Sequence, residues 1–477
     1  MTEPCDLSAT LARRLIGRKQ LSPVELMTSC INRIGSVNGR INAVVAMDAD
    51  RAMAQARQAE QSVMAGEPLG VLAGLPIGIK DLDSTAGLRT TQGSLLFKDF
   101  IPEIDDPMVA NVRRAGAIVL GKTNTPEFGA GANSVNRVYG ATGNPFSTDL
   151  SAAGSSGGSA AALATGMMPL ATGSDMGGSL RTPASFCGVV GFRPSPGRVP
   201  DTASTVALSP FAVLGPMART VDDAHLLLMA QLDVDRRDAY STNEAHAIPC
   251  QLQGADLSRV RVAFSTDLGA APVDKDIRKV FAAKTARFGR VFASATHSDP
   301  QMAGVHQAFE VLRGITFVAA FGEMVARKRE LLGPNIIDNT ERALMWSLRD
   351  VARAHQGQTA IYRNFLNFFN DFDILICPAS AVSPYPHSER YVTHINGEAM
   401  PTYISWLAIA YSLTMALAPV CCIPCGRDHL GLPFGIQIAG PRGSDAKVLA
   451  IAKSLADVLA SDPETARPVP EIASLSP

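Results

Sequence analysis

The chain carries two kinds of hydrophobic pattern that alternate along its length. Short continuous apolar runs are typical of buried strands, whereas longer segments with a helical period are typical of amphipathic helices. The short runs predict strands at residues 75–82, 118–120, 259–264, 374–377 and 434–439. The periodic segments predict helices at residues 48–65, 275–288, 307–332, 340–370 and 445–460. This alternation indicates an α/β fold, with a large twisted mixed β-sheet covered by helices on both faces.

The N-terminal part has a mainly helical pattern. Ser22-Pro23-Val24-Glu25 combines an N-cap serine, a proline at the first helical position and a glutamate that can reach back to the cap. We expect residues 1–65 to form a helical arm packed on the core. Residues 66–465 are expected to form one domain, and residues 466–477 a tail that is loose after Asp462.

Two further helix starts are indicated by capping residues. Thr220 is followed by Asp223 at the spacing of a capping box, and Ser444 stands at the N-cap position of the helix predicted at 445–460. Residues 233–258 are polar and show little pattern, which predicts an excursion on the surface.

One uncharged segment, residues 404–426, has the length of a membrane span, which needs about 20 apolar residues. Pro419 and Pro424 interrupt it, so it is interpreted as a buried helix that runs into a buried strand. No membrane association is expected. The first 20 residues carry charge and lack the apolar core of a secretory leader, which favours a cytoplasmic protein.

Composition and charge exclude some function classes. The formal net charge is −1, and no dense run of lysine and arginine is present, so no nucleic-acid partner is expected. Eight cysteines are scattered along the chain. Cys422 and Cys425 have C-x-x-C spacing, but no second pair stands at metal-binding distance, which favours buried free thiols over a zinc or redox site.

Three short motifs match known signatures without the structural context that these signatures need. Residues 116–123 match the nucleotide-binding pattern G-x-x-x-x-G-K-[ST], but their interior is strand-forming rather than a loop that opens a helix. Residues 154–158 match G-x-S-x-G, but the preceding residues 144–153 have the pattern of a polar loop and no histidine stands in a telling context. Residues 444–447 match S-x-x-K without its companion motifs.

Two glycine-rich serine clusters dominate the centre of the chain. They are Gly154-Ser155-Ser156-Gly157-Gly158-Ser159 and Gly173-Ser174-Asp175-Met176-Gly177-Gly178-Ser179. Glycine allows backbone N–H groups to approach and hold an anion, and serines in such loops can act as nucleophiles or proton relays. Lys80 lies within the apolar run 75–82, where a lysine is costly unless it is paired, functional or able to reach solvent from the strand end.

Together these motifs resemble the amidase signature family. The resemblance covers most of the chain and is carried by Gly78-Ile79-Lys80-Asp81, the two serine clusters, Gly188-Val189-Val190-Gly191-Phe192 and residues 431–441. Ala153 replaces the family's usual glycine, and Phe192-Arg193 stands where Leu-Lys is commoner. Neither departure touches a group that performs chemistry.

The resemblance implies a Ser–cis-Ser–Lys catalytic set. Lys80 would be the general base, Ser155 the proton relay after a cis Gly154–Ser155 bond, and Ser179 the nucleophile that forms an acyl-enzyme. Ser156 would support the relay. No metal or organic cofactor is implied. The backbone N–H groups implied for the oxyanion hole are those of Met176, Gly177, Gly178 and Ser179.

The predicted function is hydrolysis of a small, largely apolar acyl or aryl amide, or of a hydrazide or ester. Residues 129–132 and 406–415 are expected to line the acyl pocket, and the family suggests a homodimer. The alternative is the A subunit of a tRNA-dependent glutamine amidotransferase, whose first half would look almost the same. A non-catalytic relative is a third hypothesis, which the intact catalytic positions disfavour.

Overall fold

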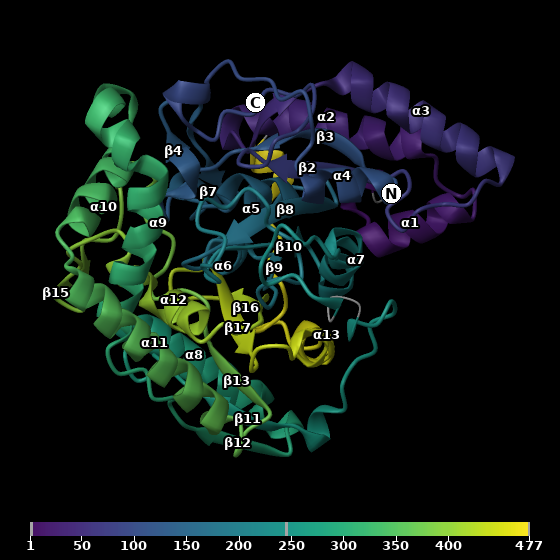
Figure 1. The fold of residues 1–477 in the computed structure, drawn as a ribbon. Helices are drawn as coiled ribbons and strands as arrows, with labels where there is room; N and C mark the ends of the chain where they lie inside the picture. The colour runs from purple at the N-terminus through teal and green to yellow at the C-terminus, as the bar shows by residue number, and fades with distance from the viewer. Residues whose placement is uncertain (1–2, 244–246, 476–477) are drawn as a thin grey trace.

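The computed structural model describes residues 3–243 and 247–475. Within these residues the chain folds around one eleven-stranded mixed sheet with parallel and antiparallel pairs (Figure 1). In sheet order its strands are β1 (Val44–Met47), β3 (Ile118–Thr123), β2 (Pro76–Lys80), β8 (Leu170–Asp175), β10 (Val213–Ala218), β9 (Val190–Arg193), β16 (Val420–Arg427), β17 (Pro433–Ala439), β13 (Ile374–Pro378), β11 (Arg261–Phe264) and β12 (Ser294–His297). The predicted α/β class with a large mixed sheet is confirmed.

Helices cover both sides of this sheet. In Figure 1, α5, α6 and α12 lie to one side of the central strands, and α7 and α13 lie to the other. Helices α9 to α11 form a layer at the left edge of the view. The helices are α1 (Ala9–Gly17), α2 (Pro23–Ile41), α3 (Ala49–Ala65), α4 (Pro107–Arg114), α5 (Gly157–Ala164), α6 (Arg181–Cys187), α7 (Val221–Gln231), α8 (Lys275–Phe288), α9 (Val305–Lys328), α10 (Pro334–Leu344), α11 (Leu348–Phe368), α12 (Ala408–Met415) and α13 (Asp445–Ala460).

A C-terminal hairpin joins two parts of the sheet. Strands β16 and β17 pair with each other, β16 also pairs with β9, and β17 also pairs with β13. Every strand on the β9 side comes from the first 218 residues, and every strand on the β13 side comes from residues 261–378. Strands from the last sixty residues thus complete the centre of the sheet.

The N-terminal arm is helical as predicted, and Ser22 and Glu25 form the predicted capping box of α2. The strand β1 was not predicted. It pairs antiparallel with β3 at the edge of the sheet. Asn42 ends α2 in a left-handed conformation, and the Oδ1 of Asn38 accepts hydrogen bonds from the N–H groups of Ala43 and Val44. These hydrogen bonds hold the turn that leads into β1. The strand has four residues, too few to show a clear alternation of apolar and polar positions in the sequence.

The single helix expected at residues 340–370 is wrong, because α10 ends at Leu344 and α11 begins at Leu348. Ser347 starts the second helix: its side chain accepts a hydrogen bond from the N–H of Asp350, whose carboxylate accepts one from the N–H of Ser347. The apolar period continues through residues 345–347 and favours one helix, but this capping box starts a new helix there instead.

Two other predicted caps differ in detail. The Thr220 side chain accepts from the N–H of Asp223, but the Asp223 carboxylate accepts from the N–H and hydroxyl of Thr10 in the arm instead of closing the box. Ser444 stands at the N-cap of α13, yet its hydroxyl donates to the carbonyl of Pro441. In both places a tertiary or turn contact takes the polar group that a local rule assigns to the helix.

The region expected to be a polar loop, residues 144–153, contains a short hairpin strand, so that expectation is partly wrong. Burial of Asn144, whose side chain donates to the carbonyls of Ser151 and Phe186, holds this hairpin in place. The three small sheets pair β4 (Val135–Asn136) with β5 (Gly140–Ala141), β6 (Gly143–Asn144) with β7 (Ser147–Ser151), and β14 (His394–Ile395) with β15 (Glu398–Ala399).

The uncharged segment 404–426 forms α12 followed by β16, both buried, as predicted. Across residues 3–243 and 247–475, no helix combines the length and apolar character that a membrane span requires. Cys421, Cys422 and Cys425 are buried free thiols, which confirms their interpretation as core residues.

The segment after Asp462 is packed rather than loose. Thr465 is buried, and its hydroxyl donates to the carbonyl of Leu459. Arg467 donates from Nε to the carbonyl of Gly188 at the end of α6, and Leu475 is buried. Separate contacts such as these give the segment no hydrophobic period that the sequence could reveal. Residues 476–477 of the predicted tail lie outside the described residues.

Candidate active site

Lys80 ends β2, a strand that lies between β3 and β8 and is parallel to both. Every residue of β2 is buried, and Lys80 has no exposed surface. The lysine therefore does not reach solvent from its strand end, which was the structural alternative. Its N–H donates to Thr172 on β8, which holds the end of the strand in place.

Ser155 and Ser156 lie in the turn before α5. The peptide bond between Gly154 and Ser155 is cis, as the resemblance implied. This turn runs against a neighbouring backbone segment: a Cβ on Gly158 would stand 2.2 Å from the amide nitrogen of Asn124. Only glycine fits there, and the close approach fixes the turn that presents the two serines.

Three serine hydroxyls surround the Lys80 ammonium group. Its Nζ lies 2.7 Å from the Oγ of Ser155, 2.9 Å from that of Ser156 and 2.9 Å from that of Ser174. Ser155 and Ser156 were predicted, whereas Ser174 was not given a role. The available signal was its place in the second glycine-rich cluster, next to Asp175 and at the end of β8.

Burial lowers the pKa of Lys80 to about 7, although the charges of Asp83 and Asp175 act to raise it. A lysine in this state exchanges a proton readily near neutral pH. Its partners are hydroxyl groups, which can donate or accept a hydrogen bond. The cluster can therefore accept a proton from a serine without losing its hydrogen bonds.

Ser179 stands at the other side of the cluster, in the loop between β8 and α6, and is partly exposed to the same cavity as Ser155. Of the four amides expected to hold an oxyanion, that of Gly178 donates to Asp175 Oδ1 at 3.1 Å and is not free. In the described structure the N–H groups of Met176, Gly177 and Ser179 donate to no protein acceptor. Three of the four expected donors are therefore available to an oxyanion, and the N–H of Gly178 is occupied by Asp175.

Asp175 holds this loop rigidly. Burial raises the pKa of Asp175, but Arg181 and then Arg193 oppose it and keep that pKa well below its usual range. The Asp175 carboxylate lies 2.8 Å from Nη2 of Arg181 and 3.4 Å from Nη1 of Arg193, and it accepts the N–H of Leu180. All three charged side chains are fully buried. Such a network fixes the conformation of the residues around Ser179.

The relay from Ser179 to Ser155 is not closed by a direct hydrogen bond. Across the described residues, Ser155 Oγ contacts Lys80 Nζ, and no hydrogen bond joins it to the hydroxyl of Ser179. The expected contact with Lys80 is thus confirmed and the one with Ser179 is absent. The two hydroxyls still line one cavity, and catalytic hydrogen bonds often tighten only when substrate is bound.

The cavity has a volume of about 420 Å³. From the expected lining segments it contains Gly129, Ala130 and Gly131, but Leu407 alone from residues 406–415. Trp406 is instead fully buried and stacks on Phe186. The prediction for 406–415 is therefore mostly wrong, since that helix packs into the core. The large apolar side chains that line the cavity are Phe97, Phe128, Phe309, Phe317, Phe321 and Met324.

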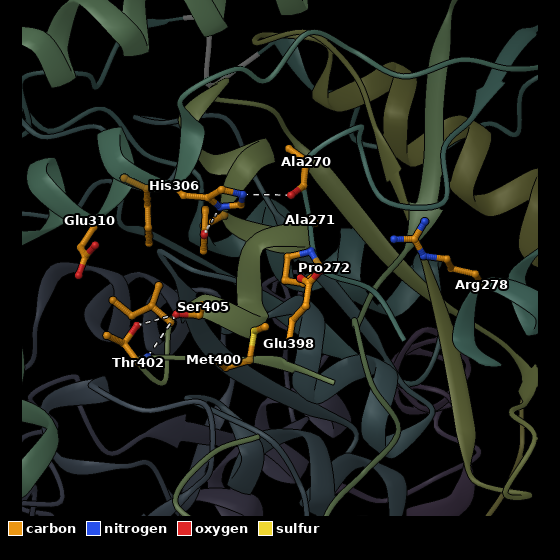
Figure 2. A pocket seen from close by; sticks show the side chains of 13 residues that line it. Ala270, Ala271, Pro272, Arg278, His306, Glu310, Glu398, Met400, Thr402 and Ser405 are labelled. Carbon is orange, nitrogen blue, oxygen red and sulfur yellow. Dashed lines mark hydrogen bonds between the residues drawn. The ribbon is translucent and has the colours of Figure 1, made fainter. Parts of the chain in front are cut away.

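A second cavity of about 350 Å³ borders the first. Figure 2 shows His306 in its wall, with Nδ1 2.6 Å from the hydroxyl of Tyr411 and Nε2 3.0 Å from the carbonyl of Ala270. The Ser405 hydroxyl contacts Thr402. In the described residues that line this cavity, no serine is joined to a basic side chain by a hydrogen bond, whereas Ser155 of the first cavity is bonded to Lys80.

The nucleotide-binding pattern at residues 116–123 forms a strand. Lys122 lies on β3 and is fully buried, and its ammonium group donates to the carbonyl of Asp83 and the hydroxyl of Thr85. A phosphate-binding lysine must reach a loop that cradles the phosphates. The interpretation of this motif as strand is confirmed.

Known proteins that are similar to this chain belong to the family that the sequence motifs indicated. The sequence profile of the family described as Amidase matches residues 25–449. An acylamidase from Rhodococcus erythropolis is 33% identical over 449 residues, which cover 94% of each chain. The A subunit of the glutamyl-tRNA(Gln) amidotransferase from Picosynechococcus sp. is 31% identical, over 90% of this chain and 93% of its own.

Solved structures agree with these sequence relatives. A bacterial aryl acylamidase of the amidase signature enzymes superposes with a TM-score of 0.86 at 28% identity, and the match covers 96% of both chains. The shared architecture thus extends over nearly the whole chain.

Proposed function

Because this chain belongs to the amidase signature family and is a carbon–nitrogen hydrolase, we propose that it hydrolyses a small, largely apolar acyl or aryl amide, or a hydrazide or ester. We assign Ser179 as nucleophile, Ser155 as proton relay and Lys80 as general base, with Ser156 in support. The contact that carries the proposal is the hydrogen bond of 2.7 Å between fully buried Lys80 and Ser155, in the cavity that also exposes Ser179.

In the proposed reaction, neutral Lys80 takes the hydroxyl proton of Ser155 as Ser155 takes that of Ser179. The Oγ of Ser179 then attacks the amide carbonyl carbon, and the oxyanion is held by the free N–H groups of Met176, Gly177 and Ser179. When the C–N bond breaks, the proton returns from Lys80 through Ser155 to the leaving nitrogen. Water then releases the acid from the acyl-enzyme by the same proton route.

This proposal is tested with a panel of aryl amides, aliphatic amides, anilides, hydrazides, esters and glutamine. We expect the purified chain to hydrolyse at least one apolar amide and to accumulate an adduct of the acyl mass on Ser179. Ser179→Ala should give neither product nor adduct. An adduct on another residue, or undiminished turnover by Ser179→Ala, would overturn the assignment. Complete inactivity would favour the non-catalytic relative, which the intact Lys80–Ser155 cluster opposes.

A second candidate is the A subunit of a tRNA-dependent glutamine amidotransferase, because proteins of that name are about as similar to this chain as the acylamidase is. An enzyme of this kind should hydrolyse glutamine, and the chain should copurify with partner subunits. Activity on apolar anilides without any partner would favour the amidase. Cytoplasmic location and a homodimer remain predictions, and the latter is measurable by analytical ultracentrifugation.

A further inference from the structure

Besides Asp175, which is paired with Arg181 and Arg193, three carboxyl groups line the catalytic cavity. Asp83 follows β2, Asp106 precedes α4, and Asp201 lies between β9 and β10, yet all three share the cavity with Ser155 and Ser179. The charge of Asp106 acts on both Asp83 and Asp201, and the charge of Asp201 acts on Asp83. Segments far apart in the sequence thus bring negative charge together beside the nucleophile.

Asp83 lacks the partners that a buried carboxylate needs. It is 8% exposed, and its Oδ2 is buried without a hydrogen-bond partner. Burial raises the pKa of Asp83 to about 7, because the nearby charge of Lys122 offsets this effect only in part. An unpaired buried carboxylate is costly, and a cation that enters the cavity would relieve this cost.

The other two carboxyls are satisfied only in part. Asp106 accepts the N–H of Ser84 at 2.6 Å, and Asp201 accepts the N–H of Ala203 at 3.1 Å. Burial raises the pKa of both. Across residues 3–243 and 247–475, neither of them nor Asp83 lies within ion-pair distance of a basic side chain.

The cationic side chains of this region have other partners. Lys122 is committed to the carbonyl of Asp83 and the hydroxyl of Thr85. Arg313, which also lines the cavity, is held by Asn339 and Tyr403. The negative charge of the three carboxyls is therefore not neutralised by an ion pair within the described chain.

We infer that the cavity binds substrates with an apolar body and a protonated amine, the amine being held by Asp83, Asp106 and Asp201. The aromatic and aliphatic side chains of α9, such as Phe317 and Met324, contact the apolar body. This inference relies on the proposed function for the reaction itself. It narrows the substrate class to amides that carry an alkylammonium group. Charge-assisted hydrogen bonds are the strong ones in such a site.

Binding is tested without turnover, by calorimetry of the wild-type protein with hexylammonium and with 1-hexanol. We expect hexylammonium to bind about 10- to 100-fold more tightly, the range of a hydrogen bond to a charged group. Asp201→Asn and Asp106→Asn should each reduce that ratio, and Asp83→Asn most of all. Asp457→Asn is the matched control, since it removes the same charge from the exposed side of α13.

Equal binding of the two ligands by the wild-type protein would overturn the inference. So would a ratio that Asp201→Asn and Asp457→Asn reduce equally, because it would then reflect net charge alone. Asp201 lies in a loop and is partly exposed, so this variant decides the question even where Asp83→Asn does not fold.

Turnover measurements distinguish a failure of this inference from a failure of the proposed function. The substrates are the anilides of 5-aminopentanoic and hexanoic acid, which differ by an ammonium in place of a methyl group. We expect kcat/KM to be about 10-fold or more higher for the cationic anilide. If neither anilide is cleaved but hexylammonium binds through the carboxyls, the inference stands and the reaction assigned is wrong. Equal cleavage of both would overturn the inference and leave the amidase.

Discussion

Two buried lysines on neighbouring strands have different surroundings. Lys80 on β2 and Lys122 on β3 have no exposed surface, and burial lowers the pKa of Lys80 to about 7 and that of Lys122 to about 8. Lys80 Nζ contacts three serine hydroxyls, whereas Lys122 Nζ contacts a backbone carbonyl and the hydroxyl of Thr85. Depth of burial is therefore not what distinguishes them.

The difference lies in what each partner can exchange. A serine hydroxyl can give a proton to a neutral amine and still accept an N–H, so Lys80 is satisfied in either protonation state. A backbone carbonyl only accepts, and the carboxyls of Asp81 and Asp83 favour the charged form of Lys122. The hydroxyl partners of Lys80 thus suit the base role proposed for it, whereas the carbonyl partner and nearby carboxylate charges of Lys122 suit a structural cation.

The largest expected effect is the loss of activity in Lys80→Met. Removal of the amine leaves Ser155 without a base, so kcat/KM on a good amide should fall by about 10³-fold or more. Lys80→Met combined with Ser155→Ala should cost little more than either alone, because the residues act as a unit. Steady-state kinetics of the two single variants and the double variant measure this. Near-wild-type activity of Lys80→Met would show that Lys80 is not the base, and the contrast with Lys122 would then not concern function.

Lys122→Met should affect stability rather than chemistry. It leaves the carbonyl of Asp83 and the hydroxyl of Thr85 without their donor in the core, which should lower the free energy of unfolding by about 2 kcal/mol. Urea denaturation at neutral pH gives this value, with Lys279→Met on the exposed side of α8 as control. A variant as stable as wild type would show that these acceptors do not need Lys122.

The pH profile sharpens the comparison further. In the proposed mechanism neutral Lys80 is the active form, so kcat/KM should rise with pH through a midpoint near 7. The Asp83 charge acts to raise the pKa of Lys80, so Asp83→Asn should move this limb to lower pH, by about half a unit or more. Lys122→Met should retain a rising limb. Profiles with a maximum near pH 5 would contradict a lysine base and point to carboxylates.

The smallest expected effect is that of ATP. Because Lys122 and Thr123 lie within a buried strand, millimolar ATP with Mg²⁺ should change neither the melting temperature nor the rate of amide hydrolysis. Thermal denaturation with and without the nucleotide checks this. Chelation by EDTA should likewise leave turnover unchanged. Stabilisation by ATP would mean that residues 116–123 bind phosphate after all.

The contact of Lys80 with Ser155 and Ser156 could be predicted because each residue stands in a local motif with few structural alternatives. Lys80 breaks an otherwise apolar run. The glycines around Ser155 and Ser179 indicate places where the backbone must approach another group closely. The cis bond before Ser155 followed from the same resemblance. These features depend on short stretches of sequence, whose local conformation does not depend on where they lie in the fold.

Features that depend on distant partners could not be predicted. The N–H of Gly178 is taken by Asp175, whose position depends on two arginines. The cavity is closed by side chains of α9 rather than by the helix at 408–415, and sequence does not reveal which face of a helix meets the cavity. The packing of Arg467 likewise depends on a distant partner, the carbonyl of Gly188. The break at Ser347 is different, because its capping box with Asp350 is local and could have been predicted in place of the longer helix.

The place of the β16–β17 hairpin in the sheet determines when a nascent chain can complete that sheet. Synthesis delivers the strands that end at β9 first and those that end at β13 later, and these two edges have no bond to each other. Until residues 420–439 leave the ribosome, both edges expose unpaired backbone groups, which are templates for association with other chains. Ser179 follows a strand of the first group in the chain, whereas α9 follows a strand of the second group, and both line the catalytic cavity. The two groups of strands therefore become one sheet only when one of the last segments has been translated.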